Sequence, residues 1–363
     1  MLLTGLLTLQ TMFVEAGSLG GTIHVPTDAP TIQIAIEDSQ PFDTIIVAPG
    51  SYFEAIGFGG KVITVQSANP NDPNVVAATI INAGGLGSVV TFSGGEDQVN
   101  TILDGFTITG GTIGIDAHSS RAVIRHCIIR DNSSDGINQA DGAVEDCQIL
   151  NNNGGGLFDC DGSIRRCLIR NNKTFGLRDC DGTIIDSRIE RTREGPGVAW
   201  GSVDIVRSVV SSNSGQGGVY QHTGDIEQSF IVGNGSLGGI YGSNSDSGLV
   251  RNSVIAGNRT ASYGGITYSR KHILNCTVTG NGPYGFYGHS GTIRHVILWD
   301  NVLGPLNSST TPVFSGTANP YFVRPGFWDL VNNVWVDGDY PELFRSAPIL
   351  RPPCELSYCC KDS

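Results

Sequence analysis

The chain has 363 residues, of which 50 are glycine, 39% are apolar and 15% are charged. Asp and Glu outnumber Lys and Arg by 34 − 22 = 12, which argues against a nucleic-acid partner because phosphate binding needs clustered cations. The glycines follow no three-residue period, so the chain is not collagen-like. The acidic balance favours a neutral or basic ligand, or a divalent cation.

The first 20 residues are apolar and contain no lysine or arginine. The triplet Val14-Glu15-Ala16 before Gly17 resembles a cleavage site, although the basic start of a secretory signal is missing. Residues 1–20 are therefore a candidate leader segment, and we expect a secreted, periplasmic or cell-surface protein. We expect no transmembrane span, because this segment is short and broken and no other stretch is apolar enough to cross a bilayer.

Residues 29–40 place Ile32, Ala35 and Ile36 at helical spacing. We expect a short amphipathic helix that caps the first turn of the fold, because the open end of a solenoid would expose unpaired backbone. Three strand-like runs follow it, at residues 43–55, 61–67 and 88–94.

From about residue 102 to residue 301 one sequence frame recurs every 20–24 residues. It reads apolar, two variable residues, Cys or Ser, one residue, Ile or Val, two residues and Asn, as in IRHCIIRDN (124–132) and VEDCQILNN (144–152). Short β-branched runs at this period predict a coil of stacked parallel strands. The last position of the frame is held by Asn132, Asn152, Asn172, Thr192, Asn213, Asn234, Asn258, Asn281 and Asn301.

Equivalent residues of successive rungs should stack about 4.8 Å apart. The column that contains Ile129, Ile149 and Ile169 is expected to point inward, where burial of each side chain gives about 1.5–3 kcal/mol. The asparagine column is expected to form a ladder of side-chain amides at a tight bend. The predicted fold is all-β: a single-stranded parallel β-helix over residues 21–311 with a short N-terminal capping helix, followed by an irregular C-terminal cap over 312–363 that we expect to lie on the last rung.

Three segments carry a resemblance to a known family: TIHVPTDAPTIQIAIEDSQPFDTIIVAPGSYFE (22–54), KVITVQS (61–67) and ILDGFTITGG (102–111). With NPYFV (319–323) near the end, they resemble bacterial parallel β-helix repeat proteins of the pectin-lyase superfamily. The resemblance implies a right-handed coil and extends to about residue 349. That superfamily includes lyases, hydrolases, esterases, epimerases and adhesins, so the resemblance does not select an activity.

The cysteines of the frame share their column with serine, which predicts a slot for small buried side chains. Cys127, Cys147 and Cys167 stand in this column, and Cys160 and Cys180 form a second stacked pair. We interpret them as buried thiols, although stacked rungs nearly permit a disulfide. Cys354, Cys359 and Cys360 in the tail are better candidates for disulfides if the protein is exported.

The column after the apolar residue of the second strand holds an aromatic residue in several rungs and is expected to face outward. Spaced rings on a rigid surface form a platform on which sugar faces can stack, and Tyr and Trp add a polar edge for hydroxyl groups. The alternative is that the rings stack on one another or are covered by loops. The candidate ligand-binding residues are Phe158, Trp200, Tyr220, Tyr241, Tyr268 and Tyr287, with His222 and His289 as nearby donors.

Aspartates also stack from rung to rung, with Asp159 below Asp179 and Asp161 below Asp181. Like charges about 4.8 Å apart repel, so a cation, Arg178 or solvent should relieve them. One hypothesis is a calcium site; the alternative is a set of solvated turn acids. The candidate metal ligands are Asp141, Asp159, Asp161, Asp179 and Asp181, and the candidate catalytic residues are Asp159, Asp179, Asp181 and Arg178.

Three functional hypotheses result. The first is an exported β-helix that binds a polysaccharide or cell-surface glycan along its aromatic face without catalysis. The second is a divergent polysaccharide lyase acting on uronate-containing polysaccharide, in which the aspartates and Arg178 would move a proton beside a bound cation. The third is a structural or adhesive surface repeat. The motifs of polygalacturonases, pectate lyases and pectin methylesterases are incomplete or missing, so an enzyme is the weaker expectation.

Overall fold

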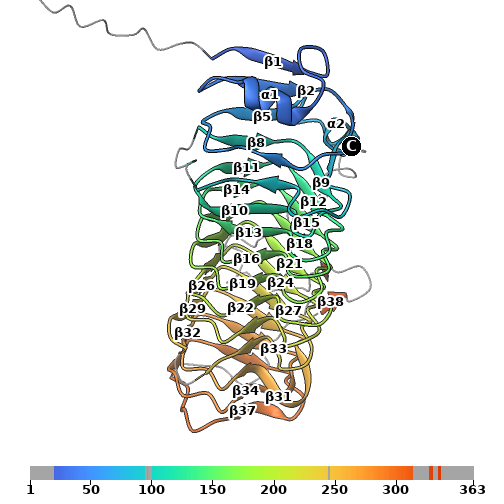
Figure 1. Ribbon diagram of the computed structural model, residues 1–363. Helices are drawn as coiled ribbons and strands as arrows, with labels where there is room; N and C mark the ends of the chain where they lie inside the picture. Colours follow the sequence, from blue (N-terminus) through green and yellow to red (C-terminus); the bar gives the residue numbers. More distant parts are fainter. Residues whose placement is uncertain are drawn as a thin grey trace, which may run out of the picture.

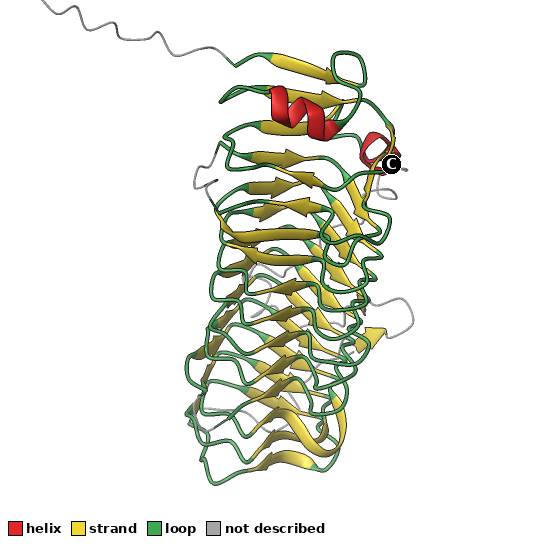
Figure 2. Ribbon diagram, viewed as in Figure 1, coloured by secondary structure: helices red, strands yellow, loops and turns green. Residues whose placement is uncertain are grey.

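The computed structural model describes residues 20–94, 96, 100–243 and 246–313, together with the short strands Phe327–Asp329 and Val334–Val336. Within these residues the chain coils around one axis and forms three parallel sheets that run the length of the molecule (Figures 1 and 2). Each full turn contributes one strand to each sheet. The predicted parallel β-helix is therefore confirmed.

Sheet A contains β1 (Thr22–Val25), β2 (Thr44–Val47), β5 (Thr64–Ser67), β8 (Ile102–Asp104), β11 (Val123–Arg125), β14 (Val144–Glu145), β17 (Ser163–Arg165), β20 (Thr183–Ile185), β23 (Asp204–Val206), β26 (Ile226–Glu227), β29 (Leu249–Arg251), β32 (His272–Leu274) and β35 (Ile293–Arg294). Sheet B contains β3 (Gly50–Tyr52), β6 (Thr79–Asn82), β9 (Thr107–Thr109), β12 (Ile128–Arg130), β15 (Gln148–Leu150), β18 (Leu168–Arg170), β21 (Arg188–Glu190), β24 (Val209–Ser211), β27 (Phe230–Val232), β30 (Val254–Ala256), β33 (Thr277–Thr279) and β36 (Ile297–Trp299).

Sheet C contains β4 (Ile56–Gly57), β7 (Val90–Thr91), β10 (Ile115–Ser120), β13 (Ile137–Ala140), β16 (Leu157–Phe158), β19 (Leu177–Arg178), β22 (Val198–Ala199), β25 (Val219–Tyr220), β28 (Ile240–Tyr241), β31 (Arg259–Thr267), β34 (Gly282–Tyr287) and β37 (Gly304–Asn307). The strands β38 (Phe327–Asp329) and β39 (Val334–Val336) pair with each other in an antiparallel sheet.

The rungs stack in the register that the sequence frame predicts. Ile129 pairs with Ile149, and Ile149 pairs with Ile169, each in parallel. All three side chains are at most 1% exposed and belong to one continuous core. Stacking identical β-branched side chains along the axis fills the interior of the coil and fixes each rung on the next.

The asparagine column forms the expected ladder. The side-chain amide of Asn132 donates to Oδ1 of Asn152 (3.0 Å), and that of Asn152 donates to Oδ1 of Asn172 (3.0 Å). The same Oδ1 of Asn172 also accepts the backbone N–H of Asn152 (3.0 Å). Each amide is buried, and leaving one unpaired would cost about 1–3 kcal/mol. Thr192 interrupts the amide series, but its backbone N–H still donates to Asn213.

The expected N-terminal helix is present as α1 (Ile32–Asp38), with Thr31 as its N-cap. Ile32, Ala35 and Ile36 are its buried residues, and the helix contacts β1, β2 and β4. A second helix, α2 (Pro73–Ala78), begins at the N-cap Asp72 and was not expected from the sequence. The candidate leader and most of the predicted C-terminal cap lie outside the described residues.

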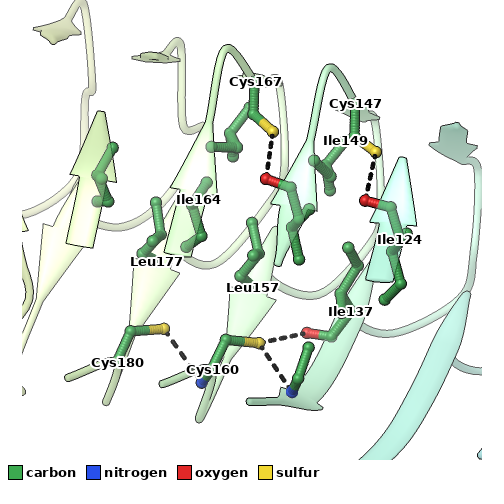
Figure 3. Packing of buried hydrophobic residues seen from close by; sticks show 14 of the residues in the cluster. Ile124, Ile137, Cys147, Ile149, Leu157, Cys160, Ile164, Cys167, Leu177 and Cys180 are labelled. Carbon is green, nitrogen blue, oxygen red and sulfur yellow. Dashed lines mark hydrogen bonds between the residues drawn. The ribbon is translucent and has the colours of Figure 1, made fainter. Parts of the chain in front are cut away.

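The described cysteines are free and buried, as the small-slot interpretation predicts. Figure 3 shows the thiols of Cys147 and Cys167 directed at the carbonyls of the rung before: Cys147 Sγ donates to Ile124 O (3.6 Å). Cys160 Sγ contacts Ile137 O (3.8 Å) in the same way. Burial raises the pKa of the Cys147 and Cys160 thiols well above the usual range, so both stay protonated. These thiols pack the core and are not poised for reaction.

Candidate ligand-binding face

The outward side chains of sheet C form a strip of rings along the coil. In each strand of this sheet an inward residue, such as Leu157 or Val219, is buried, and the next residue points outward. We call the following residues the aromatic strip: Phe158, Arg178, Trp200, Tyr220, Tyr241, Tyr263, Tyr268, Tyr284 and Tyr287. They belong to seven consecutive rungs, β16 to β34, and therefore extend over about 29 Å at about 4.8 Å per rung.

The rings of the strip contact one another without a gap from Trp200 onward. Trp200 meets Tyr220 edge to face with ring centroids 5.5 Å apart, and Tyr220 stacks on Tyr241 at 5.4 Å and 16°. Tyr268 then meets both Tyr241 (5.8 Å) and Tyr287 (5.4 Å) at close to a right angle. The strip thus combines one stacked pair with rings that are turned across it.

Arg178 links Phe158 to this series. Its guanidinium carbon lies 5.3 Å from the ring centroid of Phe158 and 5.2 Å from that of Trp200. It also lies 5.6 Å from the centroid of Phe175, whose side chain is buried. These distances are within the range of cation–π attraction, so Arg178 takes the place of a ring in the strip.

The strip is open to solvent. Tyr268 is 43% exposed, and the other tyrosines, Phe158 and Trp200 are partly exposed. Tyr268 rests on the backbone of Gly288, where an added Cβ would lie 2.6 Å from Cδ1 of the tyrosine ring. Two hollows of about 480 and 380 Å³ lie elsewhere on the described surface and contain no strip residue. The strip is therefore an open face.

The two histidines expected beside the strip lie inside the coil, so that part of the prediction is wrong. His222 and His289 are each 1% exposed. Each follows a residue with positive φ, Gln221 (47°) and Gly288 (58°). The turn at that residue reverses the alternation of the strand, so the next side chain points inward.

Burial also keeps the two imidazoles neutral. His222 Nε2 donates to Val203 O (2.6 Å), while burial, and secondarily the charge of Lys271, lowers its pKa to about 3. Burial lowers the pKa of His289 to about 4, and neither of its ring nitrogens has a hydrogen-bond partner. Lys271 is itself buried, with a pKa lowered to about 8, and its ammonium donates to Gly224 O (2.6 Å).

The stacked aspartates do not assemble a metal site. Among the residues that the structure describes, no group of three or more His, Cys, Asp or Glu side chains could hold a metal ion. Asp161 Oδ1 accepts the backbone N–H of Asp181 (3.0 Å), and Asp181 Oδ1 accepts the backbone N–H of Ser202 (2.6 Å). The proposed calcium ligands Asp141, Asp159, Asp161, Asp179 and Asp181 are thus not brought together as a metal site, and Asp161 and Asp181 instead cap neighbouring rungs.

The remaining acidic side chains are also engaged. Asp159 accepts a hydrogen bond from Gln139 (3.1 Å), and Asp179 accepts one from Arg178 Nε (3.1 Å). Burial, together with the charges of Asp181 and Asp141, raises the pKa of Asp161. The stacked carboxylates thus repel one another, and their charges make the flank of the strip electronegative.

Three members of the aromatic surroundings were missed by the sequence columns: Phe175, Tyr263 and Tyr284. Tyr263 lies in the long strand β31, whose pairing with β34 shifts register between Arg259 and Gly264. The rungs there are 23–24 residues long instead of 20. The extra residues displace Tyr263 from the regular frame, and the longer spacing was the available signal for it. Phe175 and Tyr284 lie in 20-residue rungs, so this spacing does not account for them.

Comparison with known proteins supports the fold. Residues 63–190 match the family model described as right handed beta helix region. No curated protein matches the chain in sequence. Neither helix in the described part of the chain is long and apolar enough to cross a membrane.

Two solved structures are similar to this chain. One is pectate lyase Pel9A, with 14% identity, coverage of 84% of this chain and 82% of that chain, and a TM-score of 0.45. The other is the A-module of the Azotobacter vinelandii mannuronan C-5 epimerase AlgE6, with 15% identity, coverage of 80% and 94%, and a TM-score of 0.46. These likenesses concern the fold, and the two activities are stated of those proteins alone.

Proposed function

We propose that this right-handed parallel β-helix is an exported or cell-surface protein that binds a polysaccharide or cell-surface glycan along the aromatic strip and catalyses no reaction. The observation that carries the proposal is the unbroken series of contacting, partly exposed side chains from Phe158 to Tyr287 on one outer face, all of them aromatic except Arg178. A rigid row of rings suits the apolar faces of sugar residues, and the tyrosine hydroxyls suit their hydroxyl groups.

The ring orientations suggest which residues would contact sugar faces. In the stacked pair Tyr220 and Tyr241, each ring uses a face on its neighbour, at 16°. Trp200 and Tyr268 are turned by 81° and 79° from that pair, so neither ring lies flat on it, and Arg178 lies over one face of Trp200 at 5.2 Å. We assign sugar stacking to the turned rings and hydroxyl contacts to the stacked pair.

The charge beside the strip favours a neutral glycan. Asp159, Asp161 and Asp179 lie at the adjacent corner, and Arg178 donates to Asp179. A polyuronate would meet these carboxylates and a chain whose formal net charge is −12, so its approach would be repelled.

The engaged carboxylates also support binding without catalysis. A general base must be within reach of the proton that it removes and must be able to accept it. Asp181 instead accepts hydrogen bonds from the backbone N–H of Ser202 (2.6 Å) and from its hydroxyl (3.0 Å). A carboxylate that holds the next turn in place is poorly suited to proton transfer.

Isothermal titration of the full-length protein with soluble neutral polysaccharides and with polyuronates, in EDTA, tests the proposal. We expect binding to a neutral polysaccharide that the double variant Tyr220→Ala/Tyr241→Ala weakens by at least tenfold. The control Phe53→Ala/Leu86→Ala removes exposed apolar side chains (79% and 78% exposed) outside the strip and should bind normally. Equal affinity of the two variants would contradict a site on the strip.

The lyase alternative has its own readout. Incubation with polyuronates should release no unsaturated oligosaccharide, which would absorb in the ultraviolet. Product release that disappears in Asp179→Ala would overturn the non-catalytic proposal. Silence in both assays would leave a structural or adhesive role.

Export is tested by the N-terminus of the native protein. Mass spectrometry of protein from the culture medium or the cell envelope should show a chain that begins at Gly17, after Ala16. An intact Met1 in the cytoplasmic fraction would contradict this part of the proposal.

A further inference from the structure

The middle of sheet B carries buried apolar side chains on its outer face. In β24, β27 and β30 the central residues Val210, Ile231 and Ile255 point into the coil, so the flanking residues point outward. We define the outer patch as Val209, Phe230, Val232, Val254 and Ala256, a cluster separate from the main core.

The burial of this patch requires a cover. Val232 is 0% exposed, Ala256 is 3% exposed and Val209 is 6% exposed. Neighbours within a sheet contact an outward side chain along its edges but leave its tip in solvent. Full burial on the outer surface therefore means that another layer lies over these strands.

The patch is local to these rungs. At the equivalent positions of β12 and β15 the chain has Arg130, Gln148 and Leu150, which are partly or fully exposed. In β33 the outward residues are Thr277 and Thr279, both partly exposed. Among β12, β15, β24, β27, β30 and β33, apolar outward side chains are buried only in β24, β27 and β30, whereas the apolar Leu150 of β15 is partly exposed. The local burial therefore supports a dedicated docking surface.

We propose that the C-terminal segment, residues 314–349, folds back along the coil and packs on the outer patch. This segment contains two of the four tryptophans, Trp328 and Trp335, and six further aromatic residues. A segment so rich in apolar side chains needs an apolar partner surface. The strand β38, which belongs to it, lies at the level of β24 and β27 along the coil (Figure 1).

The segment can reach the patch. Val313 forms a bridge with Arg294 in the last strand of sheet A, three rungs beyond the rung of Val232. Three rungs correspond to about 14 Å along the axis. The 13 residues between Val313 and Phe327 span at most about 43 Å when extended, so the linker is long enough with slack.

A second copy of the chain is the less suitable occupant. A stable interface between two proteins buries roughly 800 Å² on each partner. Five neighbouring side chains provide much less area, whereas a covalently attached segment needs no such area because its effective concentration is high. In this proposal the C-terminal segment lies along sheet B and not over the last rung, where the sequence analysis expected a cap. The proposal does not depend on glycan binding.

Thiol labelling of the full-length protein tests the cover. Val232→Cys should react with a maleimide at least tenfold more slowly than Thr279→Cys, which occupies the same outward position in the strand after next. Peptide mass spectrometry locates the label, so the nine native cysteines do not interfere. Ala256→Cys provides a second covered position in case Val232→Cys misfolds. Equal rates at the covered and the control position would overturn the proposal.

A photo-crosslinking amino acid at position 209, at the margin of the patch, identifies the occupant. We expect a crosslink at monomer mass to a peptide within residues 314–349. A crosslinked dimer, or a crosslink within the monomer to a peptide outside this segment, would overturn the assignment. The same preparation should also retain protected Val232→Cys, which ties the crosslink to the folded state.

Discussion

The outer faces of sheets B and C differ although the same rungs build them. In the middle rungs sheet B directs Val209 and Val232 outward and buries them, whereas sheet C directs Tyr220 and Tyr241 outward and leaves them partly exposed. The inward residues of both sheets are nearly equivalent isoleucines and valines. The core residues therefore determine the coil, whereas the outward residues of each sheet can differ without changing it.

The two faces differ because aliphatic and tyrosine side chains behave differently in contact with water. An aliphatic side chain has no polar atom, so a cluster of them on the surface favours contact with another layer. A tyrosine ring combines an apolar body with a hydroxyl group and tolerates partial exposure. The outer face of sheet B is therefore suited to permanent packing and that of sheet C to reversible contact.

The largest effect should come from a charge placed in the covered patch. Val232→Asp should lower the free energy of unfolding by about 4 kcal/mol or more, because a buried unpaired charge is strongly unfavourable. Thr279→Asp, at the partly exposed equivalent position, should change it by less than about 0.5 kcal/mol. Denaturant titration measures both. Similar small losses would show that positions 232 and 279 of sheet B are equally open to solvent.

Acid should lower the free energy of unfolding of the coil because of a histidine that is buried beneath sheet C. The pKa of His289 is about 4 in the folded protein against 6.5 for an ordinary histidine. Between these values the unfolded chain binds a proton that the folded chain does not, so stability falls as pH drops from 6.5 towards 4, by up to about 3 kcal/mol. The measurement is denaturant titration at several pH values.

The variant His289→Phe separates this contribution. Both ring nitrogens of His289 lack partners, so a phenyl ring should preserve packing at pH 7 and make the dependence on pH below 6.5 shallower. The part contributed by buried His222, whose pKa is about 3, should remain. His24→Gln, which replaces an imidazole whose side chain is 54% exposed, should leave the slope unchanged. An unchanged slope in His289→Phe would mean that other groups control acid unfolding.

Much of the fold could be predicted because stacking repeats one constraint in every rung. The columns of Ile149 and Asn152 are set by burial and by hydrogen bonding along the axis, and both leave a residue pattern at fixed spacing. The same reasoning placed Phe158, Tyr220 and Tyr241 on one face. Those features depend on neighbours one rung away, which the sequence lists in order.

The rest depended on backbone turns that the sequence does not mark clearly. His222 was expected as a donor beside the outward ring column, but the positive φ of Gln221 turns its side chain inward. The stacked aspartates suggested a cation, but their partners are backbone N–H groups such as that of Ser202. Every residue except proline has a backbone N–H group, so a column of residue types cannot show which N–H group a carboxylate will bind.

Changes at Tyr268, one of the turned rings, should act mainly on glycan binding. Tyr268→Ala should weaken glycan binding by about tenfold, equivalent to about 1.4 kcal/mol, with little change in stability because the side chain is 43% exposed. Gly288→Ala should weaken binding similarly, since its Cβ would displace the Tyr268 ring, but should also cost stability at a φ of +58°. Phe53→Ala, which removes a 79% exposed ring outside the strip, is the control. Normal binding by both Tyr268→Ala and Gly288→Ala would place the sugar on the stacked pair instead.

The smallest effect should come from Arg178, which stands where a ring would be expected. Its guanidinium lies 5.2–5.6 Å from three ring centroids, and such a contact is worth about 0.5–1 kcal/mol at exposed sites. Arg178→Met keeps the apolar stem and should lose that amount in denaturant titration, while Arg178→Lys should lose less because an ammonium retains the charge. If Arg178→Met is as stable as the unmodified protein, the cation adds nothing to the rings, and sheet C then resembles sheet B in depending on apolar contact alone.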